Sequence, residues 1–131
     1  KGIELNKFSM TKFGIPYCYS PVIIAKKHLL IDNKKEYALF TKATQKGYLY
    51  SAKNKSNSVD ILKDYLTDYD KTNIDIHKSI EATAPYFGNE KECGFLKPER
   101  VAIFLKWILE HNLENKAIIK QHLFTNELLK Y

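Results

Sequence analysis

Two tyrosines stand close together near the start of the chain, in the run Tyr-Cys-Tyr-Ser at residues 17–20. Glycine and proline residues surround this run, and such residues interrupt helices and strands. A tyrosine offers a flat face for stacking and a hydroxyl for hydrogen bonding, which suits a planar heteroaromatic ligand. Tyr19, Tyr17 and Ser20 are therefore candidate ligand-binding residues. The alternative is a rigid turn whose rings cover the edge of the core, and the local sequence alone slightly favours that turn.

The other reactive residues form no catalytic or metal-binding pattern. None of the four histidines stands at metal-ligand spacing from another histidine or from a cysteine. Cys18 and Cys93 are too few for a disulfide scaffold, and the sequence has no nucleophile elbow and no glycine-rich phosphate loop. Asp60 and Asp64 fit a solvated helix face better than an acid/base pair. We therefore expect no catalytic residue, no metal ligand and no cofactor-binding residue in this chain.

The distribution of charge argues against nucleic acid as a partner. The formal net charge is +6, but only Arg100 among the 21 basic residues is an arginine. Arginine is the usual residue for bidentate contacts with bases and phosphates. Acidic residues also interrupt the lysines throughout, which favours a lysine-rich solvated surface. A basic helical interaction module stays as an alternative, and salt-sensitive binding to DNA would support it.

Composition sets further bounds on the kind of protein. The chain has 131 residues, of which 44% are hydrophobic, enough for one compact domain with a buried core. No stretch approaches eighteen consecutive apolar residues, so we expect no membrane-spanning helix. The chain opens on Lys1 without the charged, apolar and small-residue series of a signal peptide, so we expect such a signal to be absent or already removed.

The hydrophobic pattern predicts two strands followed by four helices. The strands are expected at Ile3–Phe8 and at the β-branched run Val22–Ala25. The helices are expected at Asn33–Ala52, Ser58–Tyr65, Asn73–Ala84 and Pro98–Asn112. Gly47, inside the first helix, costs about 1 kcal/mol relative to alanine, which predicts a neighbour in close approach. Because two strands alone make a poor sheet, their partner strands should come from outside this chain or from a second copy of it.

Four segments, taken in order, span nearly the whole chain. They are Phe13–Ala25 (FGIPYCYSPVIIA), Phe40–Tyr48 (FTKATQKGY), Lys97–Arg100 (KPER) with Trp107, and Leu123–Leu129 (LFTNELL). Together they resemble the motifs of the thiamine-pyrimidine precursor family. This family comprises substrate-binding proteins of bacterial ABC importers and fungal-type pyrimidine synthases. Tyr17 and Cys18 depart from the Asp-Leu pair that is commoner in the first motif.

The resemblance implies a helix-rich α/β fold, as the C-terminal portion of a two-lobed, type II periplasmic-binding-protein fold. In that fold residues 1–12 would hold the last strand of one lobe. Residues 13–25 would form the hinge-crossing segment and a strand, and residues 26–131 would form the helical cover of the other lobe. Strand edges exposed in the isolated piece predict that it dimerises or swaps strands.

The function implied by the resemblance is that of a solute-binding receptor. It would deliver a thiamine-related aminomethyl-pyrimidine, stacked on aromatic side chains with Tyr19 first among them, to the membrane subunits of an ABC importer. It would be periplasmic or a cell-surface lipoprotein in its full-length form, and would hold no cofactor. The alternative is a cytoplasmic pyrimidine synthase of thiamine biosynthesis, whose cysteine-rich iron motif, pyridoxal phosphate lysine and substrate histidine are not identifiable here.

Overall fold

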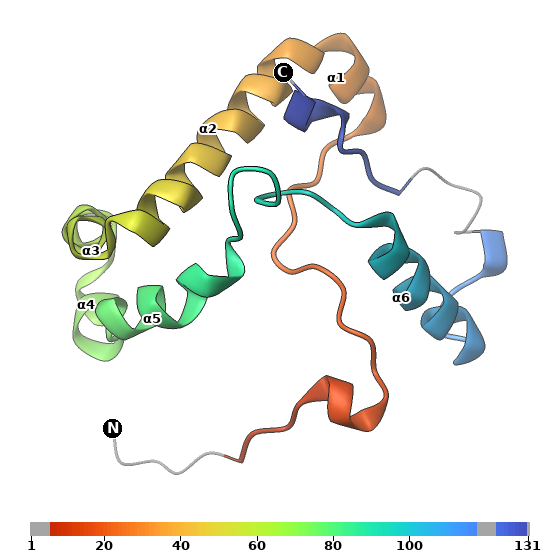
Figure 1. The fold of residues 1–131 in the computed structure, drawn as a ribbon, viewed down its shortest axis with the longest axis horizontal. Coiled ribbons are helices and arrows are strands. Elements are labelled where there is room, and N and C mark those ends of the chain that lie inside the picture. The colour runs from red at the N-terminus through yellow and green to blue at the C-terminus, as the bar shows by residue number, and fades with distance from the viewer. Residues whose placement is uncertain (1–5, 118–122, 131) are drawn as a thin grey trace. The chain divides into compact units, whose positions relative to one another are not determined.

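The computed structural model describes residues 6–117 and 123–130, and the chain divides into two compact units (Figure 1). Unit 1 comprises Lys1–Ile24 and Leu96–Thr125, and unit 2 comprises Ala25–Phe95 and Asn126–Tyr131. Each unit therefore joins segments that are far apart in the sequence, and each is described separately below.

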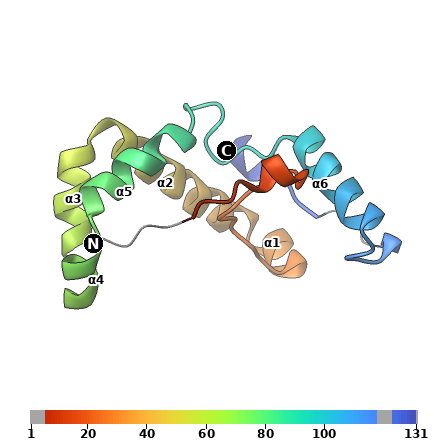
Figure 2. The same cartoon turned by 90° about the horizontal axis from the view of Figure 1, so that it is seen from below.

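Unit 2 is built from helices. Its α-helices are α1 (Lys27–Asp32), α2 (Lys34–Lys53), α3 (Lys55–Lys63), α4 (Asp68–Asn73) and α5 (Ile76–Thr83). Two short 3-10 helices complete it, η2 (Ala84–Tyr86) and η4 (Glu127–Lys130). Figures 1 and 2 show α3 and α5 beside one end of α2, while η4 lies against the other part of α2. The ammonium of Lys34 lies 2.9 Å from the carboxylate of Glu127 and so joins α2 to η4.

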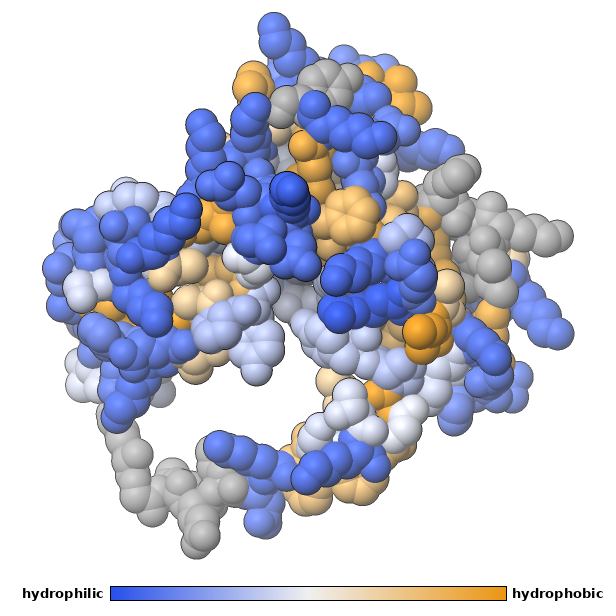
Figure 3. Space-filling view, in the orientation of Figure 1, coloured by the Kyte–Doolittle hydropathy of each residue, from blue (hydrophilic) through white to orange (hydrophobic). Residues whose placement is uncertain are grey.

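The core of unit 2 is small. The residues it buries are Ala38, Ser58, Val59, Ile80, Ala84 and Cys93. Ile80 and Ala84 stand four residues apart and lie on one inward face of this segment. No large side chain in the described part of the chain is completely buried, and many apolar atoms remain at the surface (Figure 3). The stability of unit 2 therefore depends on a few residues.

One side chain of α2 holds the loop that follows η2. The amide nitrogen of Gln45 donates to the carbonyl oxygen of Glu90 at 3.2 Å and to that of Cys93 at 2.9 Å. Gly88 and Gly94 bound this loop with φ angles of 75° and 81°, a conformation that glycine adopts without steric cost. The loop thus places Cys93 in the core although it contains no regular helix.

Unit 1 contains the 3-10 helix η1 (Met10–Phe13) and the α-helix α6 (Pro98–Glu110). None of its described residues is buried. On α6 the ring of Trp107 stacks between neighbours, with its centre 6.4 Å from that of Phe104 and 4.5 Å from that of His111. The apolar face of this helix is half-buried, so packing within unit 1 covers it only in part; it comprises Val101, Phe104, Leu105 and Ile108.

The predicted strands are wrong, and so is the α/β class. Residues 3–5 of the segment Ile3–Phe8 lie outside the described residues, and residues 6–8 form neither strand nor helix. Val22–Ala25 is not a strand either, and Ile24 is 87% exposed. A strand needs a neighbouring backbone for its N–H and C=O groups, and the described residues supply none to this segment. In its described parts the chain is helical and has no strand.

Two predicted helices are confirmed and two are displaced. Asn33–Ala52 is found as α2, and Pro98–Asn112 is found as α6, which starts at its proline. The helix predicted at Ser58–Tyr65 is found as α3, which begins earlier, directly after Asn54. α1 has no counterpart in the prediction. Every helix in the described part of the chain is too short or too polar to span a lipid bilayer.

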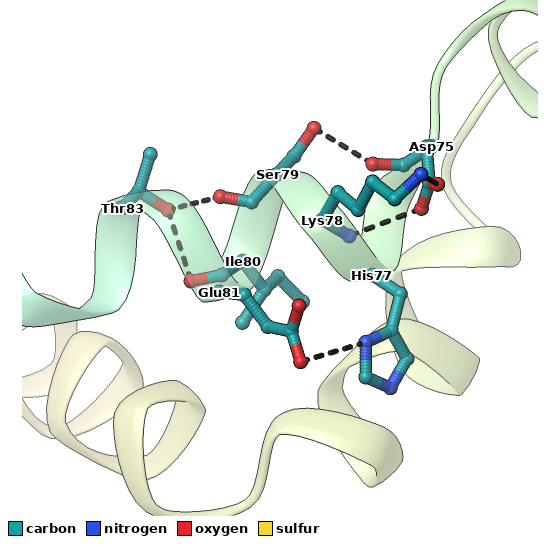
Figure 4. Close-up of polar contacts among 7 residues, drawn as sticks. All are labelled: Asp75, His77, Lys78, Ser79, Ile80, Glu81 and Thr83. Atoms are coloured by element: carbon teal, nitrogen blue, oxygen red, sulfur yellow. Dashed lines mark hydrogen bonds and ion pairs between the residues drawn. The ribbon is translucent and has the colours of Figure 1, made fainter.

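The helix predicted at Asn73–Ala84 is found as the shorter α5, which starts at Ile76, and α4 precedes it where no helix was predicted. Side chains cap the starts of both helices. The hydroxyl of Thr67 accepts a hydrogen bond from the N–H of Asp70 and caps α4. The carboxylate of Asp75 accepts one from the N–H of Lys78 at 3.0 Å and caps α5 (Figure 4). Caps of this kind satisfy N–H groups that have no partner within the helix. Residue 74 therefore belongs to a break and not to a helix interior.

The cap at Asp75 makes α5 sensitive to acid. The N–H of Lys78, followed by its ammonium, lowers the pKa of Asp75 below its ordinary value. A carboxyl with a lowered folded-state pKa stabilises the fold at neutral pH, and this contribution is lost as the pH falls through that pKa. We expect Asp75→Ala to lower the melting temperature by a few degrees at pH 7, measured by circular dichroism. Asp75→Asn keeps an oxygen acceptor, so it should melt between the two.

The two variants also test the charge of the cap. Once the pH has fallen below the lowered pKa of Asp75, the wild-type carboxyl is protonated, so the wild type and Asp75→Asn should melt at nearly the same temperature. If Asp75→Ala melts with the wild type at pH 7, the cap contributes nothing to the stability of α5.

Candidate functional site: a cluster of two tyrosines and one arginine

The segment that carries the candidate tyrosines is an irregular stretch held at its start by Gly14. Gly14 has a φ of 74° and ends η1, and its N–H donates to the carbonyl oxygen of Thr11 at 3.2 Å. Such left-handed glycines commonly end helices. Residues 15–19 then run on without helix or strand. The side chains of Tyr17 and Tyr19 are therefore positioned by what they contact and not by a regular element.

Tyr19 contacts the start of α6. Its hydroxyl oxygen accepts a hydrogen bond from the N–H of Lys97 at 2.8 Å. Lys97 precedes the first residue of α6, Pro98, which has no N–H of its own. The side chain of Lys97 does not cap this helix. The tyrosine hydroxyl instead accepts from the backbone N–H of Lys97, which has no partner within the helix. This bond joins two segments 78 residues apart.

Arg100, in the first turn of α6, lies over both tyrosine rings. Its guanidinium carbon is 5.1 Å from the ring centre of Tyr19 and 5.9 Å from that of Tyr17. Both distances are within the range of cation–π attraction. Within the part of the chain that the structure describes, no carboxylate forms an ion pair with Arg100. We call Tyr17, Tyr19 and Arg100 the tyrosine–arginine cluster.

The structure brings two of the three candidate residues together. Tyr17 is 47% exposed and Tyr19 is half-buried, so the rings keep surface that a ligand can reach. Ser20 is exposed, and its hydroxyl makes no hydrogen bond within the described residues. Arg100 was not among the predicted site residues. Two signals could have pointed to it, since it is the only arginine of the chain and lies in the motif KPER.

The cluster suits recognition of a flat ring. Its tyrosine rings present π faces, the guanidinium presents several N–H donors, and the hydroxyl hydrogen of Tyr19 is still available because its oxygen acts as the acceptor for Lys97. Cys18, between the two tyrosines in sequence, is a free cysteine, and Cys93 belongs to unit 2. Burial raises the pKa of the Cys93 thiol, which keeps it protonated at neutral pH. Stacking and hydrogen bonding are therefore the chemistry that the cluster offers.

Comparison with known proteins gives one family match. Residues 1–58 match the model of a family described as NMT1/THI5 like. The match contains Tyr17 and Tyr19 but ends before Arg100, and it covers less than half of the chain. No curated protein and no solved structure matches the chain. The family match supports the resemblance that the motifs at Phe13–Ala25 and Phe40–Tyr48 suggest.

Proposed function

We propose that this chain is part of a solute-binding receptor for a thiamine-related aminomethyl-pyrimidine, which feeds an ABC importer. The observation that carries the proposal is the tyrosine–arginine cluster. In one unit it joins the exposed ring of Tyr17, the half-buried ring of Tyr19 and a guanidinium that forms no ion pair within the described residues. The family match at residues 1–58 supports a pyrimidine of thiamine metabolism as the ligand class. The match is equally compatible with a synthase.

The ligand would bind by stacking its pyrimidine ring on Tyr17 and Tyr19. Stacking of a base on an aromatic side chain contributes about 1–3 kcal/mol to binding. The N–H groups of Arg100 would donate to ring nitrogens, which are hydrogen-bond acceptors, while the guanidinium keeps its contact with the tyrosine faces. Ser20, next to the cluster in sequence, would supply a hydroxyl at its edge.

The proposal is tested by titrating the chain with aminomethyl-pyrimidine and its formylated form, observed by nuclear magnetic resonance. The cluster is exposed, so we expect weak but saturable binding, with a Kd on the order of 1 mM. The signals of Tyr17, Tyr19 and the Arg100 side chain should shift together. Benzylamine is a matched control, because it has the aminomethyl group and the flat ring but no ring nitrogens. Unchanged cluster signals, or equal shifts with benzylamine, would contradict pyrimidine recognition.

The synthase alternative has an observable of its own. A pyrimidine synthase of this family would form an internal aldimine between a lysine and pyridoxal phosphate, which absorbs visible light. A receptor mixed with pyridoxal phosphate should show no such stable absorbance band after dialysis. A stoichiometric band would favour the enzyme over the receptor.

A further inference from the structure

Gly47 has open space beside it, and this was not expected from the sequence. It lies in the interior of α2, where a glycine costs about 1 kcal/mol relative to alanine. The sequence predicted a neighbour in close approach as the reason for it, and that prediction is wrong. A Cβ atom built on Gly47 would meet nothing within 4 Å. The glycine therefore borders a space that its missing side chain helps to leave open.

This space is a hollow of about 480 Å³ within unit 2. One wall is α2, which contributes Thr44, Gly47 and Ser51. The opposite wall is α5, whose residues Ser79, Ile80 and Thr83 line the hollow. Most of these residues have small side chains, so the space between the two walls is left unfilled. A volume of this size lies within the range of small-molecule binding sites in proteins.

Aromatic and aliphatic side chains complete the lining. The rings of Tyr48 and Phe87 meet edge to face, with their centres 4.8 Å apart. Leu62, which lies on α3, and Leu66 are further lining residues. None of the described residues that line the hollow is charged. An ionised ligand would lose its hydration here without gaining a partner of opposite charge, so the hollow favours a neutral one.

Three of the hydroxyl groups that line the hollow are already committed as donors. Thr44 donates to the carbonyl oxygen of Phe40 at 2.9 Å, and Thr83 donates to that of Ser79 at 2.7 Å. Ser79 donates in the same way to the carbonyl oxygen of Asp75 at 2.9 Å (Figure 4). Each of these oxygens can still accept a hydrogen bond. The polar contacts that the walls offer are therefore mainly to a donor group on the ligand.

We infer that the hollow between α2 and α5 is a second binding site, for a neutral, mainly apolar small molecule that carries an aromatic ring and one N–H or O–H donor. The ring would pack against Tyr48 and Phe87, where aromatic pairs gain from edge-to-face contact. This site does not use the tyrosine–arginine cluster, so it is independent of the proposed function.

The surroundings favour a small molecule over a protein partner. A stable protein interface buries about 800 Å² on each side. Next to the lining residue Leu62 on α3, Lys63 forms an ion pair with Asp60. On α5, among the lining residues Ile76 and Ile80, the ring of His77 lies 3.5 Å from the carboxylate of Glu81. Such charged groups are depleted from the cores of protein interfaces.

The test is a fluorescence titration of the whole chain with N-phenylnaphthylamine, a neutral aromatic amine. We expect saturable binding of one molecule per chain. Gly47→Leu fills the hollow and should weaken this binding about tenfold or more. Leucine favours helix more than glycine does, and nothing lies within 4 Å of the new Cβ, so the variant should fold. Lys46→Leu is the matched control, because it adds the same side chain one residue away, outside the lining.

Two further measurements locate the bound probe and test whether the hollow prefers a neutral ligand. With isoleucine methyl groups labelled, the signals of Ile74, Ile76 and Ile80 should shift, while that of Ile103 on α6 should not. Anilinonaphthalene sulfonate, an anionic relative of the probe, should bind more weakly. Equal binding by the wild type and Gly47→Leu, or shifts centred on Ile103, would overturn the inference. It is also overturned if Gly47→Leu changes the sedimentation of the chain while the probe fails to bind, since the hollow would then accept a second copy.

Discussion

Ile80→Ala should lower the free energy of unfolding of unit 2 by about 2–4 kcal/mol, measured by chemical denaturation followed by circular dichroism. Ile80 lies on α5 with 7% of its surface exposed, and it is the largest aliphatic side chain among the buried residues. Its removal takes away apolar contacts and enlarges a space that the neighbouring helices do not fill. Because domains are commonly stable by only about 5–15 kcal/mol, such a loss is large.

Ile61→Ala is the matched control for this change. Ile61 lies on α3, the helix that packs against α5, but 46% of its surface is exposed. The same atoms are removed from a site that water already reaches, so we expect a loss of about 1 kcal/mol or less. Equal losses for the two variants would show that Ile80 is not part of a core in solution.

The helices that could be predicted from the sequence are those whose signals are local. The apolar period over Asn33–Ala52 and the proline that opens Pro98–Asn112 both lie within the helix that they predict. The break between α4 and α5 was missed although its signal is also local. Asp75 is a good helix cap, but the predicted helix starts two residues before it, at Asn73.

The predicted strands show what a local pattern cannot supply. Val22–Ala25 has the β-branched residues that strands favour, but this preference expresses packing against neighbours and not a property of the isolated segment. Whether a partner strand stands beside it depends on residues elsewhere. In the described parts of this chain no such partner is present, and Val22 is 52% exposed. The composition of a segment therefore predicts its tendency to form a strand, but not whether a partner strand lies beside it.

The same distinction applies to the tyrosine–arginine cluster. Tyr17 and Tyr19 stand two residues apart, so their joint candidacy follows from the sequence itself. Arg100 joins them only because the Tyr19 hydroxyl meets the N–H of Lys97, a contact between distant segments. No periodicity or spacing encodes that contact. The only sequence signal that linked the segments Phe13–Ala25 and Lys97–Arg100 was their resemblance to motifs of one family.

Tyr19→Ala should have the largest effect on ligand binding. It removes the ring nearest to the Arg100 guanidinium, and we expect the affinity for aminomethyl-pyrimidine to fall about tenfold or more. Tyr19→Phe keeps the ring and removes only the hydroxyl that accepts from Lys97. It should bind nearly as the wild type does, while losing about 0.5–1.5 kcal/mol of stability with that hydrogen bond. Both are measured by the titration described above and by thermal melting.

These two variants separate ligand binding from a turn that merely holds the chain. If the tyrosines serve only to hold a rigid turn, Tyr19→Ala lowers the melting temperature but leaves the shifts of Tyr17 and Arg100 on titration unchanged. If they bind the ring, Tyr19→Ala abolishes those shifts and Tyr19→Phe preserves them. Tyr86→Ala is the control for loss of a tyrosine as such, since Tyr86 is 88% exposed and lies outside the cluster. It should change neither the melting temperature nor the titration, because its ring contributes to no contact that either measurement reports.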